Sequence, residues 1–226
     1  MSGDRSLLEV VQGLLERTYR MRATVPDIGR FVIGDAGYRS LYRKDEPVVS
    51  GPGSPDGART LVRETEGSVR ACIYYPDDMI TTLERHPPQL GLREENVDAF
   101  ATLVEEVDHL LCIAERAREE RPVSLFELEL HANVSKHLVL TRFLSGARNL
   151  LDGPRRAWLR WHLFHKGTPN DPDPDVSARY CGAIRWALRF LDAGARLRPH
   201  ERIDTLRRFH RASAAEKLEL IRGLRL

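Results

Sequence analysis

The chain has 226 residues, of which 42% are hydrophobic and 30% charged, values typical of a globular protein with a buried core. No apolar run approaches the ~18 residues that a membrane-spanning helix needs, and the polar N-terminus MSGDRS does not resemble a signal peptide. We therefore expect a cytoplasmic protein without a membrane partner. The cysteines Cys72, Cys112 and Cys181 are far apart and odd in number, which predicts free thiols.

Charge is divided unevenly along the chain, although the net charge is +2. Residues 1–139 contain 17 Lys/Arg and 24 Asp/Glu, whereas residues 140–226 contain 18 and 9. Two interpretations are open: the two halves attract each other, or the basic half faces an anionic partner.

The first ninety residues mix helix and strand signals. Ser6 and Glu9 have the spacing of a capping box and predict a helix over SLLEVVQGLLERTYR. A strand is expected at 31–33, GDAG at 34–37 is interpreted as a turn, and 38–42 as a strand or a helical turn. Two runs at 59–64 and 69–75 flank Glu66-Gly67 and predict a β-hairpin, which we expect to pair with the strand at 31–33.

From Pro76 onward the periodicity is helical. Long helices are expected over REENVDAFATLVEEVDHLLCIAERAREE and PVSLFELELHANVSKHLVLTRFLSG, the second ended by Gly146, and shorter ones follow to the C-terminus. Asp173 or Asp175 is expected to cap one of these. The predicted fold class is α+β, mostly α: a helical bundle with a small N-terminal antiparallel β element. Residues 1–90 would form the helix and hairpin segment and residues 91–226 the bundle, within one compact unit.

Polar residues gather inside the apolar pattern of VEEVDHLL, residues 104–111. On a helical projection Asp108 lies at the edge of the buried face, whereas Glu106 and His109 lie on the far side. The two long helices should form an antiparallel hairpin, because their link is short. The second helix is apolar on two opposite sides, which predicts a central position. A line of polar residues runs along the helix between these two sides. The expected polar layer comprises Glu105, Asp108, His109, Glu129, Asn133, Lys136 and His137.

Three interpretations of this layer compete. In the first it is structural, with Asp108 or Glu129 paired with Lys136 and bridged by Asn133. In the second it binds a metal through Glu106, His109 and His137; the chain has one Glu-x-x-His motif, whereas ferritin-like iron proteins need two, so no family is assigned. In the third, Asp108, His109, Glu129 and Lys136 perform acid–base catalysis. No cofactor is identified from the sequence.

The basic half offers a different kind of candidate site. Arginines and tryptophans alternate there, a mixture that can anchor a protein interface or hold phosphates and bases. The candidate binding residues are Arg155, Arg156, Trp158, Arg160, Trp161, Arg185 and Arg189. No complete catalytic motif is visible, so the expected function is that of an adaptor or regulatory protein with a protein partner. An enzyme that uses the polar layer and a nucleic-acid-binding protein are the alternatives, and the sequence leaves the oligomeric state open.

Overall fold

A computed structural model of the chain describes residues 5–22, 25–41, 57–65, 68–146, 151–167 and 173–224. Within these residues the chain is 71% helical, with nine α-helices and a small three-stranded sheet, which confirms the predicted α+β, mostly α class. The sheet is mixed rather than antiparallel, because the short strand β1 (Val32–Ile33) runs parallel to its neighbour β3 (Ser68–Tyr74).

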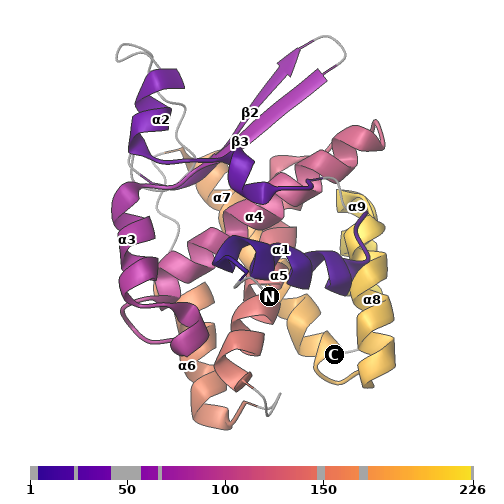
Figure 1. Cartoon of the computed structure of the whole chain (residues 1–226). Coiled ribbons are helices and arrows are strands. Elements are labelled where there is room, and N and C mark those ends of the chain that lie inside the picture. Colours follow the sequence, from indigo (N-terminus) through magenta and orange to yellow (C-terminus); the bar gives the residue numbers. More distant parts are fainter. Residues whose placement is uncertain are drawn as a thin grey trace.

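The predicted β-hairpin is present and projects from the body of the protein (Figure 1). β2 (Arg59–Thr65) pairs antiparallel with β3, and β1 pairs with the other edge of β3, as expected for the segment at 31–33. The predicted turn at 66–67 lies outside the described residues. Only the base of the hairpin is buried: Ile73 is 0% exposed, whereas Val69 near the tip is 43% exposed. The hairpin stands away from the core, so neither of its faces is buried along its whole length.

The N-terminal part contributes three helices. The capping box that begins α1 (Leu7–Tyr19) is confirmed, since Ser6 N–H donates to Glu9 Oε2 at 2.7 Å and Ser6 Oγ accepts from Glu9 N–H. α2 (Asp35–Leu41) includes the GDAG segment, so the prediction of a turn there was wrong. The backbone N–H of Asp35 at its start donates to the Asp77 carboxylate at the start of α3 (Asp77–Arg85), and this tertiary contact is invisible to local patterns.

The centre of the molecule is an antiparallel pair of long helices, α4 (Val97–Arg118) and α5 (Leu125–Ser145) (Figure 1). Arg116 contacts Glu127 near the connecting loop, and Glu105 contacts Lys136 far from it, as the predicted hairpin requires. α5 ends at Gly146, whose positive φ of 54° closes the helix. Residues 127–135 of α5 are buried without interruption, so this helix is central, as predicted.

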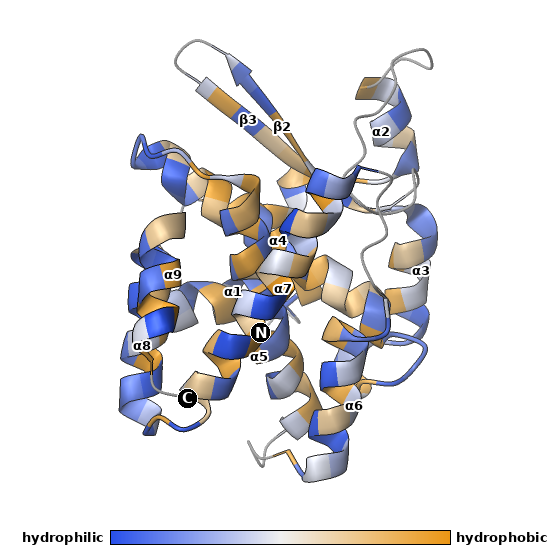
Figure 2. Cartoon of the chain, turned by 180° about the vertical axis from the view of Figure 1, so that it is seen from behind, coloured by the Kyte–Doolittle hydropathy of each residue, from blue (hydrophilic) through white to orange (hydrophobic). Residues whose placement is uncertain are grey.

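The remaining helices surround this pair. They are α6 (Gly153–Phe164), α7 (Pro174–Gly194), α8 (Pro199–Arg211) and α9 (Ala214–Gly223). Asp173 caps α7, as predicted, with Pro174 in the first turn. The helices α1, α4, α6 and α7 all contact α5, and apolar side chains from every described α-helix except α2 form the main core. In the reverse view polar residues follow the outward sides of the surrounding helices (Figure 2). None of the described helices is long and apolar enough to cross a membrane.

The central position of α5 leads to a prediction about stability. Leu130 is 0% exposed and Leu125, at the start of the same helix, is 59% exposed. Leu130→Ala should lower the free energy of unfolding by about 2–5 kcal/mol, because it leaves a cavity in a packed core. Leu125→Ala should change it by less than about 0.5 kcal/mol. Urea unfolding of both variants measures the difference, and equal losses would show that α5 is not central.

Candidate functional site

Three potential metal-ligating side chains of the predicted polar layer lie together. Glu105 and His109 are one turn apart on α4, and Glu129 faces them from α5. One ligand atom of each lies within 4.8 Å of the others. His109 and Glu129 are 8% and 6% exposed, so the arrangement is nearly closed to solvent. The side chain of Glu105 is 22% exposed and provides its most open edge.

Two buried atoms of this group have no hydrogen-bond partner among the described residues. They are Nε2 of His109 and Oε2 of Glu129. The other nitrogen of His109, Nδ1, lies 3.6 Å from Glu106 Oε2, and the hydroxyl of Thr60 on β2 donates to that same oxygen at 2.7 Å. An unpartnered buried polar atom costs about 1–3 kcal/mol, so each of these two atoms calls for a partner such as a water molecule or an ion.

Lys136 and Asn133 do not take the partners that the structural interpretation assigned to them. The ammonium of Lys136 pairs with Glu105 at 2.7 Å rather than with Asp108 or Glu129. The side-chain amide of Asn133 donates to the backbone oxygen of Glu129, one turn earlier on α5, and so does not bridge the two helices.

Electrostatics within the group favour extra protons. Burial, and then the charge of Glu105, raise the pKa of Glu129 to about 7. Burial by itself lowers the pKa of His109, but the carboxylates of Glu106, Glu129 and Glu105 outweigh it and raise that pKa to about 10. The closely spaced carboxylates therefore stabilise positive charge in this layer. A metal cation could supply that charge in place of a proton.

Asp108 belongs to a different group of side chains, through its contact with His131. Its Oδ2 accepts from Nδ1 of His131 at 2.8 Å. The Nε2 of His131 lies 3.0 Å from Nδ1 of His210 on α8, and Nε2 of His210 lies 2.5 Å from Glu115 Oε2. When both outer nitrogens donate to these carboxylates, a hydrogen bond between the two inner nitrogens requires one further proton between them.

Cys112 lies beside this chain, 3.4 Å from Nδ1 of His131. Burial and the charge of Asp108 raise the pKa of its thiol well above the usual value. The pair is therefore not an activated cysteine–histidine dyad, in which the cysteine pKa would be lowered. Next to it, Glu127 accepts from both Arg116 and Lys217, at 2.9 and 2.8 Å, in a buried ion-pair cluster.

Sequence reasoning missed Cys112, His131 and His210 as neighbours. The antiparallel hairpin places Asp108 and Cys112 at the height of His131, so the same rule that defined the polar layer could have found this contact. His210 could not be found in this way, since it is on α8, 79 residues further along the chain.

His137 and the arginine-rich candidates lie away from both groups. His137 stacks on Phe164 with ring centroids 6.3 Å apart, and burial followed by the charge of Arg160 lowers its pKa to about 4. The structure thus places Glu106 next to His109 but places His137 elsewhere. Arg160 pairs with Asp192, and Trp158 donates to Glu94.

The other predicted binding residues are distributed over two helices. Arg155, Arg156 and Trp161 belong to α6, whereas Arg185 and Arg189 belong to α7. Trp161 is 48% exposed, with Lys166 lying 5.9 Å from its ring centroid. The adaptor and nucleic-acid roles stay predictions.

Compared with protein-family models, curated proteins and solved structures, the chain matches none.

The raised pKa of Glu129 leads to a prediction for the metal-free protein. The pKa of Glu129 is higher in the folded chain than in the unfolded chain. Stability is therefore lost as the pH rises from the unfolded-state pKa towards about 7, by about 1.4 kcal/mol per unit of difference between the two pKa values. Glu129→Gln should therefore raise the free energy of unfolding at pH 8 by about 1–3 kcal/mol, and the gain should vanish near pH 4. Thermal unfolding in chelator across this pH range measures it.

Glu127→Gln is the matched control on the same helix. Burial raises the pKa of Glu127, but Lys217 and Arg116 outweigh it and hold the pKa below its usual value. Its substitution should therefore destabilise the protein at pH 8, by about 3–5 kcal/mol if both cations are left unpaired. A loss of stability in Glu129→Gln as well would show that Glu129 is a paired structural carboxylate.

Proposed function

We propose that this protein binds a divalent metal ion between α4 and α5 through Glu105, His109 and Glu129. The observation that carries the proposal is the pair of buried, unpartnered atoms, Nε2 of His109 and Oε2 of Glu129, within a group whose ligand atoms lie within 4.8 Å of one another. Nine-tenths of each of these two residues is buried, so bulk water does not satisfy them freely.

The ligand chemistry narrows the class of ion. Two carboxylates and one imidazole suit borderline ions such as Mn²⁺, Fe²⁺ or Zn²⁺. With His109 neutral, the carboxylates of Glu105, Glu106 and Glu129 exceed the ammonium of Lys136 by two negative charges, which one divalent cation balances. A metal ion would thus replace the protons that this layer otherwise retains.

The surroundings of His109 support the same reading. A metal-bound histidine commonly holds its second nitrogen against a carboxylate, which fixes the ring orientation. Glu106 takes this position at 3.6 Å from Nδ1, and Thr60 on the hairpin orients Glu106. Lys136 binds one oxygen of Glu105 at 2.7 Å, which leaves the other oxygen of that carboxylate for the ion.

Three protein ligands leave coordination positions for water or a substrate, as in catalytic rather than closed structural metal centres. An ion held here would polarise such a bound group as a Lewis acid. The partly exposed Glu105 side chain marks the side from which a small molecule would approach. We prefer this metal-binding function to the predicted adaptor role, because it accounts for buried groups that would otherwise destabilise the fold.

The proposal is tested by metal analysis of the full chain. Protein purified without chelator, or reconstituted with Mn²⁺, Fe²⁺ or Zn²⁺, should retain an ion that mass spectrometry detects. His109→Ala and Glu129→Gln should each weaken the affinity by about 100-fold or more, since each removes a ligand. Glu106→Gln should weaken it by about 10- to 100-fold, because it releases the ring of His109.

Glu119→Gln, at the exposed end of the same helix, should leave the affinity unchanged. Circular dichroism confirms that each variant is folded. If ligand and control variants bind these ions equally well, or if the wild-type chain binds none of them at this site, the layer is architectural and the proposal fails.

A further inference from the structure

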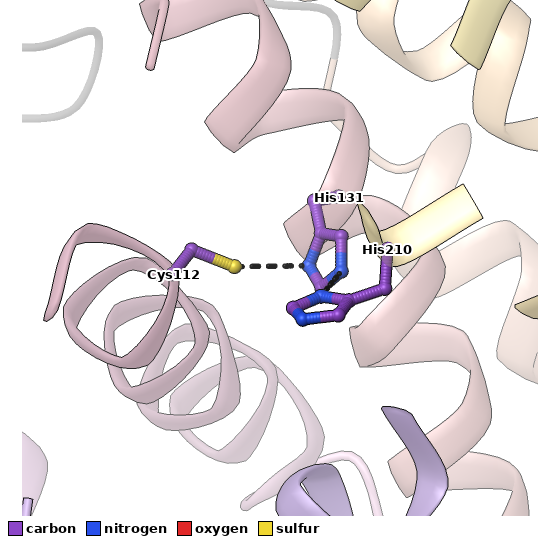
Figure 3. A group of neighbouring side chains, drawn as sticks. All are labelled: Cys112, His131 and His210. Carbon is purple, nitrogen blue, oxygen red and sulfur yellow. Dashed lines mark hydrogen bonds between the residues drawn. The ribbon is translucent and has the colours of Figure 1, made fainter. Parts of the chain in front are cut away.

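A second group of metal-ligating side chains is formed by Cys112 on α4, His131 on α5 and His210 on α8 (Figure 3). They are 7%, 2% and 5% exposed, so all three are buried. One ligand atom of each lies within 4.8 Å of the others. These residues come from three helices that are far apart in sequence, so the fold, rather than a local motif, creates the group.

The two histidines are held as metal-binding histidines are held. Asp108 fixes Nδ1 of His131 at 2.8 Å, and Glu115 fixes Nε2 of His210 at 2.5 Å. The remaining nitrogens, Nε2 of His131 and Nδ1 of His210, face each other at 3.0 Å. Carboxylates on the outer nitrogens orient both rings inward and increase the basicity of the nitrogens that would bind an ion.

We propose that Cys112, His131 and His210 bind a second metal ion, of the thiolate- and imidazole-preferring class that includes Zn²⁺ and Co²⁺. Zinc bonds of about 2.0–2.1 Å to nitrogen and 2.3 Å to sulfur place tetrahedral ligand atoms about 3.3–3.6 Å apart. The two facing nitrogens are already near this spacing. The sulfur of Cys112 lies 3.4 Å from the outer nitrogen of His131, Nδ1, so binding an ion at the inner nitrogens requires it to rotate towards them.

The charges around the group favour a divalent ion. A Cys112 thiolate and the carboxylates of Asp108, Glu115 and Glu127 carry four negative charges. Arg116 and Lys217 supply two positive charges, both directed to Glu127 rather than to the histidines. A divalent cation balances the remaining two. A small cavity lined by Cys112, Glu127, His131 and His210, among other residues, adjoins the group and offers room for a fourth ligand such as water.

This second site differs in chemistry from the one proposed above. Glu105, His109 and Glu129 offer oxygen and nitrogen only, whereas the second site adds sulfur. A thiolate ligand produces a charge-transfer absorption with Co²⁺, which oxygen and nitrogen ligands do not produce. The two proposals can therefore succeed or fail independently.

The experiment is a titration of the reduced, full-length protein with Co²⁺, monitored by absorption. The chain has three cysteines, so in the double variant Cys72→Ser/Cys181→Ser only Cys112 can supply a thiolate. We expect this variant to show a thiolate–cobalt band that saturates at one equivalent, with the intense visible bands of a tetrahedral ion. The band should persist in Glu129→Gln, which removes only the first site.

Cys112→Ser and His210→Ala should each abolish the band. Should these variants fail to fold, the double variant decides the question, because it keeps every residue of the site. Absence of a thiolate–cobalt band in the folded double variant overturns the proposal, whether or not Co²⁺ binds elsewhere. Persistence of the band in folded Cys112→Ser overturns it as well.

Discussion

The structure depends on the burial of one helix that carries many polar side chains. In α5 the nine consecutive residues 127–135 are buried, and polar and apolar side chains alternate along them. Such alternation is typical of a β-strand with one solvent-exposed face, yet here it occurs in a stretch of helix that has no solvent-exposed face. Each polar side chain points in a different direction and needs its own partner, because an unpaired buried group costs about 1–3 kcal/mol. The polar residues are Glu127, Glu129, His131, Asn133 and Ser135.

The surrounding helices meet this requirement unequally. Glu127 has Arg116 and Lys217, His131 has Asp108 and His210, and Ser135 bonds to the buried hydroxyl of Tyr19 at 2.8 Å. Glu129 is different, since its Oε2 has no hydrogen bond among the described residues. Within the buried stretch 127–135, this is the side-chain oxygen or nitrogen without a partner among the described residues. At the group of Glu129, an ion would bind beside an oxygen that has no partner. At the group of His131, an ion would replace a proton between two histidines.

The sequence predicted the elements better than it predicted the partners. Caps such as Ser6 and Asp173, the helix end at Gly146 and the hairpin follow from local chemistry, which acts over a few residues. Helical projection and the hairpin rule brought Glu105, His109, Glu129 and Lys136 to one layer, and the structure places them together. The same projection left Glu106 and His109 facing solvent, because it could not include β2, whose Thr60 covers Glu106. The contact with His210 could not be predicted, because packing across the whole core determines where α8 docks.

The position of α8 and α9 has a consequence for how the chain matures during synthesis. Translation proceeds from the N-terminus, so α4 and α5 leave the ribosome well before residues 199–217. Until then His131 lacks His210, and Glu127 lacks Lys217, the cation from α9. The central helix cannot enter a dry interior with these groups unmatched. The docking of α8 and α9 is therefore a closing step of folding, because it supplies the last partners of the buried groups on α5.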